Sequence, residues 1–130
     1  MDNTHDAPDP DDPLLVIVDC ANVMGSRPDG WWRDRKGAAE RLRDRLATGG
    51  VPGRPDPSEI VLVVEGAARG VESVPGVRVE SAPASGDDWI VELVSGTSDR
   101  PRLVVTADRE LRRRVSDLGA DVAGPRTVLG

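Results

Sequence analysis

Three short runs of aliphatic residues limit what this chain can fold into. Residues 14–18, 60–64 and 103–105 are continuously apolar rather than alternating, which is typical of strands that are buried on both faces. Such strands occur in parallel sheets with helices on both sides. An acid follows each run, directly or within three residues: Asp19, Glu65 and Asp108. The sequence therefore predicts a parallel sheet whose carboxyl edge carries acids.

The rest of the chain alternates between helical and extended patterns. Helices are predicted over 31–46, over 89–94 with Ser85 or Asp87 as N-cap, and over 108–118. Strands are predicted over 14–19, 59–65, 77–81 and 102–106, with a final short strand around Val122. This order predicts a three-layer α/β/α sandwich with a mainly parallel central sheet, in one domain over 14–130.

The first 13 residues differ in composition from the rest of the chain. They contain five aspartates, three prolines and no lysine or arginine, so we expect a disordered acidic leader. The chain has a net charge of −6, of which this leader accounts for five, so the remainder lies near −1. The low isoelectric point therefore does not exclude a nucleic-acid partner.

Cysteine usage and hydropathy indicate the compartment. The chain has a single cysteine, Cys20, which excludes an internal disulfide and agrees with a reducing environment. No apolar run approaches the roughly 20 residues of a membrane span, and the first residues lack the pattern of a signal peptide. We therefore expect a cytoplasmic protein, with Cys20 as a small buried residue rather than a reactive thiol.

Seven polar side chains come from the strand ends and helix starts that meet at one edge of a parallel sheet. They are Asp19, Asn22, Glu65, Asp87, Asp88, Thr106 and Asp108. Crowded carboxylates raise one another's pKa, and a divalent cation removes that penalty. Oxygen ligands favour Mg²⁺ or Mn²⁺, and the chain has no second histidine or cysteine from which to build a zinc site.

Each acid also has a simpler interpretation. Asp108 and the pair Asp87-Asp88 occupy positions at which an acid caps a helix, and Glu65 also fits a solvent-exposed turn. Asp19 is the hardest to explain in this way because it ends a run of five aliphatic residues. The joint occurrence of acids at three strand ends is what predicts a cation site.

Three sequence blocks stand out along the chain: Asp19-Cys20-Ala21-Asn22-Val23, Gly86-Asp87-Asp88-Trp89-Ile90 and residues 104–111. They resemble the signature blocks of NYN domains, which belong to the PIN-like superfamily of metal-dependent ribonucleases. They stand in the family's order and spacing, so the resemblance spans about residues 14–125. It implies a PIN-like sandwich and the Mg²⁺- or Mn²⁺-dependent cleavage of RNA phosphodiester bonds.

The resemblance also implies roles for the acids. By position, Asp19, Asp88 and Asp108 resemble metal-binding acids of the family. Glu65 stands where such domains often have aspartate and would be a further ligand. Asp87 or Glu65 would orient the attacking water or take its proton. We expect Asp19→Asn to abolish cleavage while leaving the fold intact.

Substrate binding is expected from side chains around these acids. Asn22 and Thr106 would hold a ligand or an oxygen of the scissile phosphate. Two clusters of basic residues suit phosphate contacts, one that includes Arg33 and one that includes Arg109, although both also fit solvated helix faces. The pair Trp31-Trp32 fits either base stacking or core packing. These polar, basic and aromatic side chains suit single-stranded or structured RNA better than double-stranded RNA.

Other functions fit the sequence less well. A haloacid-dehalogenase-type phosphatase needs a second acid two residues after the first, where this chain has Ala21. A nucleotide-binding Rossmann domain needs a glycine-rich loop after the first strand, which is absent. The alternative that stays open is a non-catalytic PIN-like module that binds RNA or another protein.

Overall fold

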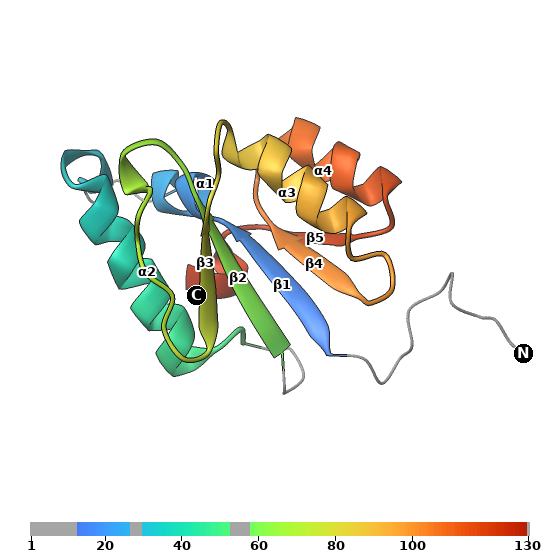
Figure 1. Ribbon diagram of the computed structural model, residues 1–130, viewed down its shortest axis with the longest axis horizontal. Helices are drawn as coiled ribbons and strands as arrows, with labels where there is room; N and C mark the ends of the chain where they lie inside the picture. Colours follow the sequence, from blue (N-terminus) through green and yellow to red (C-terminus); the bar gives the residue numbers. More distant parts are fainter. Residues whose placement is uncertain (1–12, 27–29, 53–57, 130) are drawn as a thin grey trace, which may run out of the picture.

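A five-stranded sheet with helices on both faces makes up the described part of the chain (Figure 1). The computed structural model describes residues 13–26, 30–52 and 58–129, so the predicted acidic leader lies almost entirely outside the described residues. The strands are β1 (Leu14–Asp19), β2 (Ser58–Val64), β3 (Val77–Ser81), β4 (Arg102–Val105) and β5 (Asp121–Ala123). Every neighbouring pair is parallel. The predicted three-layer α/β/α sandwich is confirmed.

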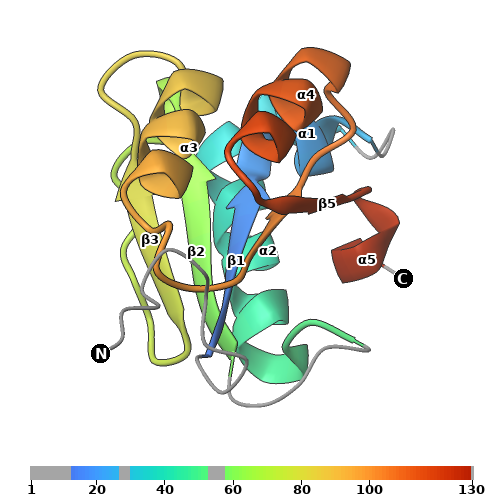
Figure 2. The same cartoon turned by 90° about the vertical axis from the view of Figure 1, so that its right-hand side faces the viewer.

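Helices cover the sheet in two layers (Figure 2). They are α1 (Cys20–Gly25), α2 (Arg35–Gly49), α3 (Gly86–Ser95), α4 (Arg109–Asp117) and α5 (Arg126–Leu129), with short 3-10 helices η1 (Trp31–Arg33) and η2 (Gly66–Ala68). Residues of α1, α2 and α5 share one apolar cluster, and residues of α3 and α4 share another. Within the described ranges, no helix has the length and apolar character to cross a bilayer.

The central strand β1 shows how one aliphatic run serves both layers. Val16 and Val18 belong to the apolar cluster beneath α1 and α2, and Leu15 and Ile17 belong to the cluster beneath α3 and α4. Successive side chains of a strand point to opposite faces, so a strand covered on both sides must be apolar at every position. Burial of each such side chain contributes roughly 1.5–3 kcal/mol.

The structure differs from the sequence prediction around the first helix. A short helix, α1, directly follows β1, in a stretch for which the sequence predicted no helix. The predicted helix over 31–46 is a 3-10 turn followed by α2, which begins after Asp34 because that carboxylate caps the backbone N–H of Gly37 at 3.0 Å. Six residues are too few to show a helical repeat, which is why α1 has no pattern of its own.

The strand order places a topological switch point beside β1. The order β3-β2-β1-β4-β5 means that the chain builds outward from β1 to β3 and then crosses to β4 on the other side. In open α/β sheets, ligands bind outside the carboxyl ends of the strands at such a reversal. Here the reversal lies between the neighbouring strands β1 and β4. Asp19 and Thr106 lie at the carboxyl ends of these two strands.

Candidate functional site

An open hollow at the carboxyl edge of the sheet is lined by acids from separate segments of the chain. Its lining residues are Asp19, Ala21, Asn22, Glu65, Asp87 and Asp108. They come from β1 and α1, from the end of β2, from the first turn of α3 and from the loop between β4 and α4. We call this the acidic hollow. Five of the seven polar residues that were expected to share one edge are therefore brought together here.

Asp19 is the buried acid of the hollow. Only 8% of the residue is exposed, and its Oδ2 accepts a hydrogen bond of 2.9 Å from Thr106 Oγ1. Its Oδ1 accepts a longer bond of 3.4 Å from the backbone N–H of Asn22. Burial raises the pKa of Asp19 from 3.8 to about 6 against the effect of these two hydrogen bonds, and the charges of Glu65 and Asp108 add to the rise.

Two hydrogen bonds connect the end of β1 to the loop after β4. Thr106 Oγ1 donates to Asp19 and accepts from the backbone N–H of Asp108 at 3.1 Å. Asn22 Oδ1 accepts from the backbone N–H of Ala107 at 2.8 Å. Thr106 is completely buried, so its hydroxyl supports Asp19 and is not open to the substrate contact that the sequence suggested. Asn22 is partly exposed and lines the hollow.

Asp108 is the N-cap of α4. Its Oδ1 accepts hydrogen bonds from the backbone N–H groups of Glu110 and Leu111, at 2.9 and 3.1 Å. The capping interpretation is therefore confirmed, and it does not remove Asp108 from the hollow, since the same residue lines it. One carboxylate oxygen is used for the cap, while Oδ2 has no hydrogen-bond partner among the residues described.

Glu65 joins β2 to the start of α3. Its Oε1 accepts a hydrogen bond of 2.6 Å from the backbone N–H of Gly86, the first residue of α3. A Cβ at position 86 would collide with this carboxylate, so the contact requires glycine there. This partner was missed from the sequence, where the only signal was a glycine placed directly before an acid pair. The extra methylene of glutamate, compared with aspartate, gives the reach across to α3.

The neighbouring acids of α3 differ in what they face. Asp87 lines the acidic hollow, whereas Asp88 lies outside the lining; both form ion pairs with Arg114 of α4, Asp87 at 3.8 Å and Asp88 at 3.1 Å. Hydrogen bonding with Ser85 and then with Arg114 lowers the pKa of Asp88. Successive helical residues point about 100° apart, and Asp87 is the one of the two that lines the hollow. The sequence favoured Asp88, and the structure places Asp87 there.

The acids line the hollow without closing around a single point. In the described ranges, no three His, Cys, Asp or Glu side chains converge closely enough to enclose a metal ion. A site for Mg²⁺ does not need such a cage, because this ion keeps several waters and is usually held by one or two carboxylates together with substrate phosphates. The donors of the hollow are all oxygen atoms, so their chemistry fits a hard cation.

The two arginines expected to contact RNA lie outside the lining of the acidic hollow. Arg33 is exposed at the end of η1, with its guanidinium 5.8 Å from the ring centre of Trp32. Arg109 is exposed at the first position of α4, next to Asp108, and forms no hydrogen bond or ion pair with any described residue. Both roles stay predictions.

The two neighbouring tryptophans have different surroundings. Trp31 packs against the apolar cluster beneath α1 and α2, and 52% of Trp32 is exposed. Core packing is therefore confirmed for one of the pair. Cys20 is fully buried as expected, and burial raises the pKa of its thiol to about 12.

Comparison with known proteins finds a likeness among solved structures. No protein-family model and no curated protein matches the chain. Among solved structures, the chain is similar to a crystal structure of a mutant of Rae1 (YacP) from Bacillus subtilis, with a TM-score of 0.70 and 19% sequence identity. The match covers 88% of this chain and 72% of the Rae1 chain. At this identity the likeness shows a shared fold.

Proposed function

We propose that this protein is a ribonuclease that hydrolyses RNA phosphodiester bonds at the acidic hollow with the help of Mg²⁺ or Mn²⁺. The observation that carries the proposal is that four acids line one hollow at the topological switch point, and that one of them, Asp19, is buried and has a raised pKa. Packing gains nothing from a buried acid in this place. The resemblance of three sequence blocks to NYN domains supports the choice of RNA as the substrate.

Asp19 is the central group of the proposed reaction. With a pKa of about 6, its carboxylate is mostly ionised at neutral pH and still basic enough to take a proton from water or to hold a cation. Thr106 and the backbone of Asn22 fix the positions of both carboxylate oxygens. Because these contacts exist before any substrate arrives, no reorganisation of Asp19 is required when a phosphate enters.

The remaining acids would share the cation and the water. Asp19 and one neighbouring acid, Asp87, Asp108 or the Glu65 oxygen that Gly86 does not use, would hold the ion together with a phosphate of the substrate. When bound, the ion lowers the pKa of a coordinated water and neutralises charge on the phosphate. Asp88 was expected to be a ligand, but we assign it to the rim of the hollow because it lies outside the lining.

Polar and basic groups around the hollow would hold the RNA. The side-chain oxygen of Asn22 is bound to Ala107, and no described residue accepts from its amide N–H groups, which could therefore donate to a phosphate oxygen. Arg109 and Arg33 would contact phosphates on either side. Thr106 acts through Asp19 and is a positioning residue.

The proposal is tested by incubating the full chain with a mixed pool of RNA in Mn²⁺ and, separately, in EDTA. We expect cleavage in Mn²⁺ alone and its loss in Asp19→Asn, whose amide retains an oxygen to accept the Thr106 hydrogen bond. Asp121→Asn is the matched control, since Asp121 is exposed at the start of β5 and lies outside the hollow.

The outcomes separate the proposal from its alternative. Cleavage that persists in Asp19→Asn would place the chemistry elsewhere and contradict the proposal. RNA that binds the wild-type protein but stays intact in Mn²⁺ would indicate the non-catalytic RNA-binding module instead. The termini of the cleaved fragments would report whether cutting starts inside the RNA or at an end.

A further inference from the structure

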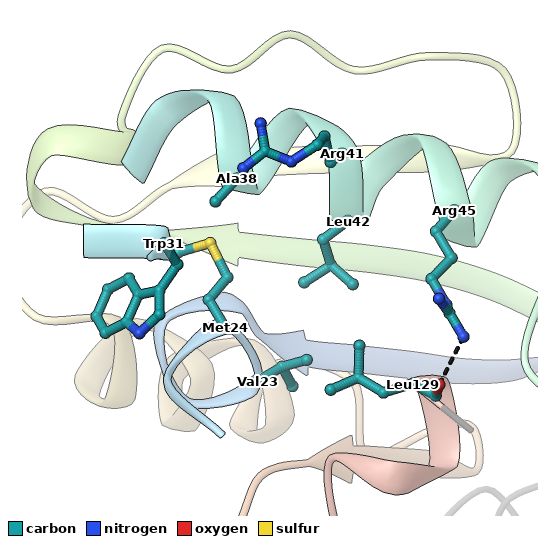
Figure 3. Close-up of a pocket in the computed structure, with 8 residues that line it drawn as sticks. All are labelled: Val23, Met24, Trp31, Ala38, Arg41, Leu42, Arg45 and Leu129. Atoms are coloured by element: carbon teal, nitrogen blue, oxygen red, sulfur yellow. Dashed lines mark hydrogen bonds between the residues drawn. The ribbon is translucent and has the colours of Figure 1, made fainter. Parts of the chain in front are cut away.

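A second hollow lies between α1, α2 and α5 and has a different chemical character (Figure 3). Its apolar walls are formed by Val23, Met24, Trp31, Ala38, Leu42 and Leu129. In Figure 3, Trp31 and Met24 lie together at one end and Leu129 at the other, with Leu42 projecting between the helices. The cavity has a volume of about 240 Å³. We call it the apolar groove.

Helix α1 is the wall that the two hollows share. Ala21 and Asn22 line the acidic hollow, and the next two residues, Val23 and Met24, line the apolar groove. An α-helix with its side chains is about 10–12 Å across, so a ligand that crossed α1 would need to span only about that distance. The groove is therefore close enough to receive a neighbouring part of a molecule bound at the acidic hollow.

The groove offers an aromatic wall and a free cation. The indole of Trp31 forms one end, beside the polarisable thioether of Met24, and the guanidinium of Arg35 lies over its ring at 5.4 Å from the ring centre. Arg41 lines the groove and forms no hydrogen bond or ion pair with the residues described, so its guanidinium is open to an anion. Arg45 differs, because it donates to the backbone carbonyls of Val128 and Leu129 at 3.2 and 2.5 Å.

Size and charge narrow the class of ligand. Pockets that enclose a whole ligand usually measure ~300–1,000 Å³, so a cavity below that range fits part of a larger molecule. An aromatic wall beside an open guanidinium suits a flat ring that is joined to an anionic group. A nucleobase with its phosphate has this chemistry, and it has to be unstacked from its neighbours to enter.

We infer that the apolar groove holds one base of a single-stranded RNA whose neighbouring phosphate lies at the acidic hollow. The inference rests on the proposed function, which supplies the RNA. It adds a contact that selects unpaired over paired RNA, because a base in a duplex is not available to stack on Trp31. Arg41 would bind the phosphate that follows the inserted base.

The test uses the fluorescence of Trp31 in the full chain. Trp32→Phe together with Trp89→Phe leaves Trp31 as the only tryptophan, since the chain has three. This protein is titrated in EDTA, where no metal-dependent cleavage occurs, with a short oligoadenylate and with an abasic ribose-phosphate oligomer of equal length. We expect the oligoadenylate to quench Trp31 and to bind more tightly than the abasic oligomer.

Substitutions test the same contact by affinity. Trp31→Ala should weaken oligoadenylate binding on the order of ten-fold and leave binding of the abasic oligomer nearly unchanged. Trp31→Phe, which keeps a ring, should retain most of the affinity and covers the case in which the alanine variant does not fold. Trp32→Ala is the control for loss of an indole, because Trp32 is exposed, meets the Trp31 ring only edge to face and does not line the groove.

The outcomes for the groove and for catalysis are independent. Equal binding of the two oligomers without quenching would overturn the inference even if the protein cleaves RNA. Base-dependent quenching in a protein that never cleaves RNA would uphold the groove and reject the proposed catalysis. Quenching by an acidic peptide that the oligoadenylate fails to displace would assign the groove to a protein segment and overturn the inference.

Discussion

Asp19 shows at the scale of one residue how the fold and the proposed chemistry depend on each other. A carboxylate that leaves water loses hydration, and the two hydrogen bonds from Thr106 and Asn22 replace only part of it. The pKa of Asp19 is consequently raised to about 6 rather than held low, as a well-paired surface acid would be. An ionised Asp19 at the switch point therefore lowers the stability of the folded protein.

That cost should depend on pH in a defined window. The folded-state pKa of about 6 lies above the unfolded value of 3.8, so the contribution of Asp19 to stability is complete below pH 3.8 and is lost as the pH rises through 6. The side chain that Asp19→Asn introduces carries no charge at any pH, so this variant does not lose stability as the pH rises through 6. Without metal, we expect it to be more stable than wild type by up to about 3 kcal/mol near neutral pH and nearly equal to it near pH 4.

Urea unfolding of both proteins in EDTA at the two pH values measures this difference. Comparing the two chains at the same pH cancels the titration of all other acids. A stability difference that does not change between the two pH values would show that burial of Asp19 does not perturb its titration.

At the scale of the element, the start of α3 is held by a contact from another strand. The first N–H groups of a helix have no partner within it, and Glu65 supplies one to Gly86 from the end of β2. A carboxylate is also favoured at this end by the helix dipole. The orientation of α3, and with it the position of Asp87 at the acidic hollow, therefore depends on a residue some twenty positions earlier.

Gly86→Ala should break this connection. A Cβ at that position meets the Glu65 carboxylate, which must then move away from the backbone N–H. We expect a loss of about 1–2 kcal/mol, because losing a hydrogen bond to a charged group outweighs the better helix propensity of alanine. The free energy of unfolding in urea measures the change.

The other end of α3 provides a control for this substitution. Gly96 has a φ of −83°, and a Cβ there makes only ordinary contacts, so Gly96→Ala should be neutral or slightly stabilising. Equal effects of the two substitutions would show that the Glu65 contact contributes nothing. A concurrent fall in the Mn²⁺ affinity of Gly86→Ala is expected if Glu65 is a ligand.

At the scale of the whole molecule, most of the architecture could be predicted because the strands are continuous and aliphatic. Burial on both faces leaves a strong composition signal, and parallel strands require crossover connections, which are usually helices. The helices α1 and α5, of six and four residues, were missed because neither is long enough to show a repeat. They matter nonetheless, since both contribute walls of the apolar groove.

The candidate site could be predicted in part for a related reason. Parallel topology brings strand ends to one edge, so Asp19 and Asp108 could be expected together. Which of Asp87 and Asp88 faces the hollow depends on the rotation of α3 about its axis. Because the two adjacent residues are both aspartates, the sequence does not indicate which of them points toward the hollow. The hydrogen bond from Gly86 to Glu65 likewise could not be predicted from the residues around Glu65, because its partner lies on another element.

The measurement that most directly tests the central claim is the melting temperature of the protein with increasing Mn²⁺. An ion that binds the folded state alone stabilises it, by about 2.7 kcal/mol at a hundred times its dissociation constant. The account predicts a rise of several degrees for the wild-type protein and for Asp121→Asn, and none for Asp19→Asn. An equal rise in Asp19→Asn, or no rise in any of the three proteins, would contradict it.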